Sequence, residues 1–227
     1  MLTAIIVAGG SGRRMGFDKT FAPLDGRPII AHSVATFDSA ECVADIIVVG
    51  REDRLEELRQ TLAACRSEKL RSIVAGGVHR HDSVAEGLKQ VRPTAEFIAV
   101  HDAARPLVTA AEIERVYAVA REYGAASLAS PVADTLKRAD ENYIVCGSVD
   151  RERVYAMQTP QIFARQLLLD AYNRVVASKL VITDEVSAVE SLGRAVVLVP
   201  NDRFNFKITY PPDLALAESV LLSRRAP

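Results

Sequence analysis

A glycine-rich segment with three basic side chains lies near the start of the chain, from Ala8 to Lys19, directly after an apolar run. Glycines let backbone N–H groups turn toward a triphosphate and form an anion-binding nest that larger side chains would obstruct. Arg14 and Lys19 add the cationic charge that stabilises oxygens on which negative charge builds during phosphoryl transfer. The segment therefore predicts a nucleoside-triphosphate site. The alternative is a glycine-rich turn with a solvated basic face.

This segment differs from both familiar phosphate loops. The pattern G-x-x-x-x-G-K-[ST] fails because Lys19 lies three residues after Gly16. The pattern G-x-G-x-x-G/A fails because Gly10 and Gly12 are followed by residues 13–15, which are Arg-Arg-Met. The sequence therefore disfavours a kinase or a dehydrogenase.

Further candidate residues follow other apolar runs. Asp102 comes after the run that begins at Phe97, where a carboxylate can hold Mg²⁺ or order hydroxyls beside phosphates. A helix cap or a turn aspartate is the alternative for Asp102. Gly76, Gly77 and Ser83 follow the third predicted strand. Taken alone, these residues are explained by a plain turn followed by a helix cap at least as well as by a role in binding.

The second half of the chain carries a scattered set of cations and hydroxyls. Cations pair with phosphate and hydroxyls recognise hydroxyls, so this set suits a phosphorylated polyol. Its members are Arg105, Thr135, Arg151, Thr159, Thr183 and Lys207. For any one of them alone, a surface position is the simpler interpretation. His79 and His81 alternate in a predicted loop without a third ligand, so we interpret them as solvated histidines rather than a metal pair.

The elements that position these residues alternate between short β-branched runs and helical patterns, which indicates βαβ units. We predict a Rossmann-like α/β fold, with a mostly parallel twisted sheet and helices on both faces. The expected strands are Ala4–Ala8, Asp45–Val49, Ser72–Val74, Phe97–Val100 and Ala126–Ser130, and the expected helices include one around Ile113–Ala120, one around Leu168–Val175 and one after Thr209. Function should lie at the carboxyl edge of the sheet.

The stretch from Val132 to Val149 interrupts this alternation. It is polar, and its β-prone flanks surround a turn at residues 140–142, so it predicts a protruding hairpin. An exposed sheet edge is usually relieved by pairing, and a second copy of the chain is the expected partner. We therefore expect a single nucleotidyltransferase domain over residues 1–227, with residues 132–149 as a dimerisation arm.

Composition narrows the possible environments and partners. The 28 basic and 29 acidic residues nearly cancel, which gives no basic footprint for nucleic acid or an anionic membrane. Cys42, Cys65 and Cys146 form neither a disulfide framework nor a zinc pattern, which fits a reducing cytoplasm. The apolar start from Met1 to Ala8 has no basic leader and is expected to be a buried strand, and no apolar run is long enough to span a bilayer.

The glycine-rich segment resembles the nucleoside-triphosphate loop of the sugar-nucleotidyltransferase superfamily. Later blocks extend the resemblance over essentially the whole chain to one family, the 2-C-methyl-D-erythritol 4-phosphate cytidylyltransferases. These blocks are Gly76-Gly77 with Arg80, Asp82-Ser83-Val84, residues 100–106, residues 134–138, Val149-Asp150-Arg151, Thr159-Pro160-Gln161, Thr183-Asp184-Glu185 and residues 206–209. Many agreeing blocks in the right order make the resemblance specific.

The resemblance implies transfer of CMP from CTP to 2-C-methyl-D-erythritol 4-phosphate in non-mevalonate isoprenoid precursor biosynthesis, with Mg²⁺ or another divalent cation, by a homodimer that exchanges its arms. It implies catalytic roles for Arg14, Lys19, Arg151 and Lys207. It implies CTP contacts from Ala8, Gly9, Gly10, Ser11, Gly12, Gly76, Gly77, Ser83, Asp102 and Ala103, acceptor contacts from Arg105, Thr135, Thr159 and Thr183, and Asp102 as the metal ligand.

One spacing and two positions depart from the family pattern. Arg14 and Lys19 are closer together than is common, a spacing that resembles the molybdenum-cofactor guanylyltransferases. Val78 stands where an acidic residue is frequent, and Tyr210 stands where arginine is frequent. The alternatives are therefore another nucleotidyltransferase, acting on a pentitol phosphate or on the molybdenum cofactor, and a non-catalytic nucleotide-binding module. The last would predict loss of cations or carboxylates such as Lys19 and Asp102, which are present.

Overall fold

The structure is a computed structural model that describes residues 1–10, 16 and 18–225. Its centre is a seven-stranded sheet in the spatial order β11-β7-β10-β6-β1-β4-β5. These strands are β1 Leu2–Ala8, β4 Val43–Gly50, β5 Leu70–Ala75, β6 Phe97–Asp102, β7 Ala125–Pro131, β10 Tyr155–Ala164 and β11 Val197–Pro200. All of them run parallel except β10, which is antiparallel to both β6 and β7. The predicted mostly parallel sheet is confirmed, as are the five predicted strands.

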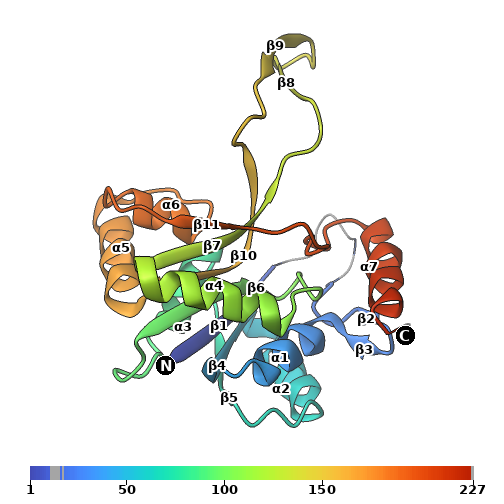
Figure 1. Cartoon of the computed structure of the whole chain (residues 1–227). Coiled ribbons are helices and arrows are strands. Elements are labelled where there is room, and N and C mark those ends of the chain that lie inside the picture. Colours follow the sequence, from blue (N-terminus) through green and yellow to red (C-terminus); the bar gives the residue numbers. More distant parts are fainter. Residues whose placement is uncertain (11–15, 17, 226–227) are drawn as a thin grey trace.

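Helices cover both faces of this sheet, as predicted (Figure 1). The helices are α1 Ile29–Ser39, α2 Leu55–Ala63, α3 Arg80–Leu88, α4 Ala110–Tyr123, α5 Arg165–Ser178, α6 Glu185–Glu190 and α7 Pro211–Ser223, with a 3₁₀ turn η1 at Glu52–Arg54. Successive strand residues point to opposite faces, so Ile6 packs with α1, α2 and α4 while Ile5 packs with α3, α5 and α6. The helices expected around Ile113–Ala120 and Leu168–Val175 are α4 and α5.

The last helix, α7, closes a smaller apolar cluster at one side of the sheet. It packs with the short ribbon of β2 Pro23–Leu24 and β3 Arg27–Pro28, and Leu24, Leu107 and Ala217 are buried between them. The helix begins at Pro211, after backbone N–H groups of Thr209 and Tyr210 that donate to the Asp213 carboxylate. This cluster holds the chain segment before α7 against the carboxyl edge of the sheet.

The arm is a two-stranded hairpin of β8 Leu136–Ala139 and β9 Val145–Val149 that projects from the body of the molecule (Figure 1). At its tip the Asp140 carboxylate accepts hydrogen bonds from the backbone N–H groups of Asn142 and Ile144. Tyr143 beside them is 91% exposed. The predicted hairpin is confirmed.

Sequence patterns did not predict β10 and β11. Within β10, Gln158, Thr159 and Pro160 interrupt the apolar pattern, and a proline inside a run argues against a central strand. The structure accommodates them with a shift in register to β7 between Met157 and Gln161. Among the described helices, none has both the length and the apolar character that a bilayer crossing requires.

Gly87 lies where α3 crosses the sheet, and its lack of a side chain allows close packing. A Cβ there would lie 2.7 Å from Ile5 Cγ2 and 3.1 Å from Val49 Cγ2. Alanine favours a helix over glycine by about 1 kcal/mol, but overpacking a buried contact costs about 1–3 kcal/mol. We expect Gly87→Ala to lower the free energy of unfolding by about 1 kcal/mol in chemical denaturation. In an Ile5→Ala background the same change should instead be neutral or stabilising. An equal cost in both backgrounds would contradict the packing explanation.

Candidate active site

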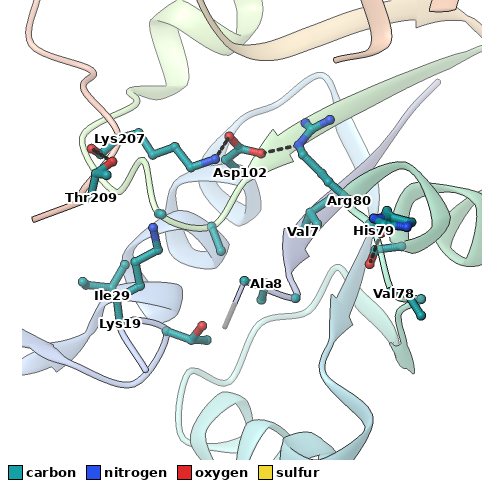
Figure 2. Close-up of a pocket in the computed structure, with 17 residues that line it drawn as sticks. Val7, Ala8, Lys19, Ile29, Val78, His79, Arg80, Asp102, Lys207 and Thr209 are labelled. Atoms are coloured by element: carbon teal, nitrogen blue, oxygen red, sulfur yellow. Dashed lines mark hydrogen bonds and ion pairs between the residues drawn. The ribbon is translucent and has the colours of Figure 1, made fainter. Parts of the chain in front are cut away.

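Two adjoining cavities open at the carboxyl edge of the sheet. The larger cavity, of about 530 Å³, lies beyond the ends of β1, β5 and β6. The smaller cavity, of about 270 Å³, lies between β6, β10 and the segment before α6. Arg80, Asp102 and Lys207 line both cavities, so these three side chains form the boundary between them. Figure 2 shows Arg80 and Lys207 reaching Asp102 from opposite sides.

The structure brings most of the predicted site residues to these cavities. The larger cavity is lined by the predicted residues Ala8, Gly9, Gly10, Lys19, Gly77, Ser83, Asp102, Ala103 and Lys207. The smaller cavity is lined by the predicted residues Asp102, Arg105, Thr159, Thr183 and Lys207. Three further predicted residues, Ser11, Gly12 and Arg14, lie outside the described residues. Gly76, Thr135 and Arg151 line neither cavity.

The glycines after β1 and β5 make room for Ser83 in α3. Ser83 is buried, and its hydroxyl donates to the carbonyl of His79 at 3.2 Å. A Cβ at Gly76 would lie 2.4 Å from the Ser83 hydroxyl oxygen, and one at Gly9 would lie 3.2 Å from it. Gly76 therefore supports the wall of the larger cavity from behind, where only a glycine fits.

Lys19 reaches the same cavity from the glycine-rich segment. Its Nζ donates to the carbonyl of Ile208 at 2.7 Å, which places it beside Lys207. Its neighbour Asp18 is largely buried and pairs with Arg54 at 3.4 Å. The guanidinium of Arg54 also lies over the Phe21 ring, 4.6 Å from its centroid. These contacts fix the end of the segment from which Lys19 extends.

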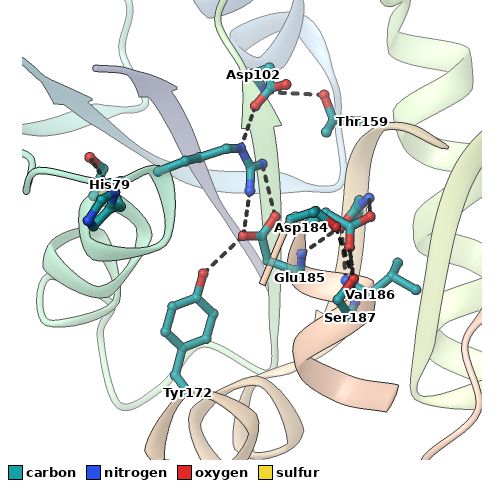
Figure 3. Close-up of polar contacts among 12 residues, drawn as sticks. His79, Asp102, Thr159, Tyr172, Asp184, Glu185, Val186 and Ser187 are labelled. Carbon is teal, nitrogen blue, oxygen red and sulfur yellow. Dashed lines mark hydrogen bonds and ion pairs between the residues drawn. The ribbon is translucent and has the colours of Figure 1, made fainter. Parts of the chain in front are cut away.

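An alternating chain of charges, which we call the ion-pair chain, crosses the boundary between the cavities. It consists of Lys207, Asp102, Arg80 and Glu185. Figure 2 shows Lys207, Asp102 and Arg80, and Figure 3 shows Asp102 and Glu185 at the other end. Lys207 Nζ lies 2.8 Å from one Asp102 oxygen, and Arg80 Nε lies 2.9 Å from the other. Burial alone would raise the pKa of Asp102, but the charges of Arg80 and Lys207 outweigh it and hold the pKa well below its usual range. Asp102 is therefore ionised throughout the physiological range.

A second buried network fixes the backbone at Asp102. The Thr159 hydroxyl oxygen accepts from the Asp102 N–H at 3.1 Å and lies 3.0 Å from His101 Nδ1. His101 Nε2 lies 3.2 Å from the Arg105 carbonyl, which can only accept, so Nε2 carries the hydrogen and Nδ1 accepts from Thr159. Burial lowers the pKa of His101 to about 3, which keeps the ring neutral. The Thr159 hydroxyl hydrogen is thus already engaged within the protein.

Arg105 and Thr183 have different surroundings in the smaller cavity. The Arg105 guanidinium donates to the carbonyls of Asn205 at 2.8 Å and Met157 at 3.2 Å, and burial lowers its pKa. These contacts hold β10 and the segment before α7 together. Thr183 is exposed, and its hydroxyl lies 3.2 Å from that of Ser187. Their roles toward an acceptor stay predictions.

Thr135 and Arg151 belong to the base of the arm and are exposed. Arg151 donates to the carbonyl of Ala133. It lines a separate hollow of about 610 Å³, together with Pro131, Ala133 and other residues of the arm base. Within one chain, Arg151 therefore lies in a hollow separate from the two cavities that the ion-pair chain borders.

The residues that sequence reasoning missed are the partners inside the ion-pair chain. Arg80 and Glu185 occur in the quoted family blocks, but neither was predicted as a site residue. They lie 105 positions apart, and Tyr172, which donates to Glu185 at 2.9 Å, lies within the helix predicted around Leu168–Val175. A single sequence carries no signal that joins these positions. Only the topology of the sheet brings them together.

No metal-binding cluster of three or more histidine, cysteine or carboxylate side chains occurs among the described residues. Within that same part of the chain, Asp102 is the one carboxylate that lines the larger cavity. Mg²⁺ is usually held by one or two carboxylates together with substrate phosphates and water. The site therefore fits a cation whose other ligands come from a bound nucleotide.

Comparisons with known proteins agree over nearly the full length. The sequence pattern of the family described as 2-C-methyl-D-erythritol 4-phosphate cytidylyltransferase matches residues 2–223. The chain is 38% identical over 226 residues to the enzyme of that name from Alkaliphilus oremlandii, covering 98% of this chain and 96% of that one. The crystal structure of 4-diphosphocytidyl-2C-methyl-D-erythritol synthase from Anaerococcus prevotii superposes with a TM-score of 0.86 at 29% identity, covering 98% and 96% of the two chains. The Thermus thermophilus cytidylyltransferase structure gives 0.79 at 31% identity, covering 99% and 100%.

Because His101 stays neutral in the fold, the stability of the protein should depend on pH in a defined way. An unfolded histidine binds a proton below its ordinary pKa of 6.5, whereas His101 resists protonation down to about 3. The free energy of unfolding therefore decreases as the pH falls from about 6.5 toward 3, by up to about 1.4 kcal/mol per pH unit. We expect His101→Gln to remove this contribution. The difference in free energy of unfolding between wild type and His101→Gln, measured by urea denaturation, should therefore shrink as the pH falls from about 6.5 to about 4.5. A constant difference between wild type and His101→Gln across the range would contradict the assignment.

Proposed function

The chain belongs to the 2-C-methyl-D-erythritol 4-phosphate cytidylyltransferase family, and we propose that it transfers CMP from CTP to the phosphate of 2-C-methyl-D-erythritol 4-phosphate. The products are 4-diphosphocytidyl-2-C-methyl-D-erythritol and pyrophosphate, in the non-mevalonate route to isoprenoid precursors. One structural observation carries the assignment of both substrates. Two adjoining cavities share Arg80, Asp102 and Lys207, so a nucleotide in one and a sugar-alcohol phosphate in the other would meet at these side chains.

We assign CTP to the larger cavity. The backbone of Ala8, Gly9 and Gly10 at the end of β1 would receive the triphosphate, and Ser11, Gly12 and Arg14, which follow in the sequence, are assigned to it as well. Gly77 and Ser83 would close on the cytosine base, with Gly76 supporting Ser83 from behind, and Ala103 also lines this cavity. Lys19 would neutralise phosphate oxygens next to the bond that breaks.

We assign the acceptor to the smaller cavity. Its phosphate would lie near Lys207 and Arg105, and its hydroxyls would face Thr183 and the Thr159 side chain. Arg151 and Thr135 would complete the phosphate and polyol contacts from the arm of a second subunit. Since Thr159 already donates to His101, its oxygen would serve the acceptor as a hydrogen-bond acceptor.

The reaction needs positioning and charge neutralisation rather than a covalent enzyme intermediate. An oxygen of the acceptor phosphate attacks the α-phosphorus of CTP in line and forms the new P–O–P link. The bond to the β-phosphate oxygen breaks, and pyrophosphate leaves with the electron pair. Lys19 and Lys207, with Arg14 and Arg151, would balance the charge on the oxygens around the α-phosphorus.

A divalent cation, Mg²⁺ in the first instance, would supply further neutralisation of the triphosphate when it is bound. Asp102 is the candidate protein ligand, directly or through water. Both of its oxygens are engaged by Arg80 and Lys207, which favours a cation held mainly by the nucleotide phosphates.

The substrate assignment can be tested by pyrophosphate release from CTP, GTP, ATP and UTP, each with methylerythritol phosphate and with ribitol phosphate. We expect rapid turnover only for CTP with methylerythritol phosphate, and loss of turnover when EDTA removes the divalent cation. Faster release with ribitol phosphate or with GTP would favour a different nucleotidyltransferase. Absence of turnover with every pair would favour a non-catalytic module.

The arm assignment predicts active sites shared between two subunits. Lys19→Ala and Arg151→Ala should each be inactive, but mixing them under exchange conditions should form hybrid dimers with one intact and one doubly damaged site. Random exchange of equal amounts makes half the dimers hybrids, so about a quarter of all sites should recover activity. If activity stays at the level of the separate variants while exchange is independently verified, Arg151 serves its own subunit's site.

A further inference from the structure

Glu185, the first residue of α6, is the most completely buried member of the ion-pair chain. Its exposed fraction is 0%, although it carries a carboxylate. The two Glu185 oxygens accept from Arg80 Nη1 at 2.8 Å and Nη2 at 3.0 Å, and Tyr172 donates to one of them at 2.9 Å. This forked contact uses the pre-organised planar geometry of a guanidinium.

The backbone of Glu185 is fixed as firmly as its side chain. Gln161 in β10, itself 1% exposed, accepts from the backbone N–H groups of Glu185 at 3.1 Å and Val186 at 3.2 Å. Its amide nitrogen donates to Asp184 at 3.0 Å. Glu185 is therefore a rigid point from which the position of Arg80 is determined.

With two nitrogens held by Glu185, Arg80 can present only its Nε to Asp102. Asp102 thus shares its charge between Arg80 and Lys207, one oxygen each. When substrate phosphates draw Lys207 away, Asp102 keeps a cationic partner and remains in place. Without Glu185 the guanidinium would be free to turn, either to take both Asp102 oxygens or to approach the phosphates itself.

We propose that Glu185 is a positioning residue for the transfer reaction, which acts through Arg80 to hold Asp102 and release Lys207 for the phosphates. The inference rests on the proposed function, because it gives Lys207 a phosphate to bind. Glu185 lines neither cavity, so a substrate bound in either cavity would not reach it. A buried pair is weak evidence of a stabilising role, since such pairs are often replaceable by apolar residues without loss of stability. A role in positioning accounts for its connection to the site.

Glu185→Gln tests the proposal, because glutamine keeps the volume of the side chain and removes its charge. We expect kcat to fall about 10- to 100-fold, as for a small misplacement of catalytic groups, while KM for CTP changes less than about threefold. The assay is steady-state pyrophosphate release on the full-length protein, with folding verified by thermal unfolding. Wild-type kcat in a folded Glu185→Gln variant would overturn the proposal. An inactive wild-type protein would instead overturn the proposed function.

Two substitutions serve as matched controls. Glu190→Gln makes the same chemical change at an exposed position of α6 and should leave kcat unchanged. Tyr172→Phe removes a hydrogen bond to the Glu185 carboxylate but leaves its contact with Arg80, so its effect should be small. A loss of kcat in Tyr172→Phe as large as in Glu185→Gln would assign the effect to general disturbance of the buried pocket and overturn the proposal.

A double-mutant cycle distinguishes action through Arg80 from an independent effect. Arg80→Lys cannot form the forked contact, so the double variant Glu185→Gln/Arg80→Lys should have no lower kcat than the worse single variant. Additive losses would overturn the proposal. If Glu185→Gln does not fold, Glu185→Asp carries the same cycle, because its shorter side chain keeps the charge but withdraws the carboxylate from Arg80.

Discussion

Asp102 lies at the carboxyl end of β6 with one oxygen against Arg80 and the other against Lys207. A buried carboxylate with a single cation would be tied to it, and a cation so engaged would be a poor partner for phosphate. Two cations change this balance, since Lys207 can leave while Arg80, held by Glu185, keeps the carboxylate ionised and hydrogen-bonded. The position of both cavities depends on this arrangement, because the three side chains form their common wall.

The sheet topology explains how distant segments supply these side chains. Asp102 ends β6, Arg80 begins α3 after the glycine turn that follows β5, and Lys207 lies in the segment before α7. In the sheet, β10 lies between β6 and β7 and runs antiparallel to both. Thr159 of β10 can therefore reach the Asp102 backbone from the neighbouring strand. A parallel strand at this position would enter the sheet at its amino edge, away from Asp102. The antiparallel insertion is thus part of how the site is built.

The sequence predicted five of the six parallel strands and the arm from local signals, and local signals together with the family resemblance predicted half of the residues that line the two cavities. Glycine turns after apolar runs indicate the carboxyl edge of a sheet, and Asp102 directly follows such a run. The strand β10 could not be predicted in this way, since Pro160 and its polar neighbours break the pattern and only the register shift reconciles them. The contact between Arg80 and Glu185 joins residues 105 positions apart and has no local signature. The position of Arg151 away from the cavities of its own chain likewise depends on the direction of the arm (Figure 1).

The two legs of the arm continue into β7 and β10, which pair side by side in the central sheet. Residue pairs can therefore be added to or removed from the tip during evolution without changing the register of any strand in the sheet. The arm can diverge in length and surface chemistry while the catalytic centre is conserved. Its base cannot diverge as freely, because β10 leads within a few residues from Tyr155 to Thr159, which supports Asp102. We therefore expect related sequences to vary most at the apex of the hairpin and least where its second leg enters the sheet.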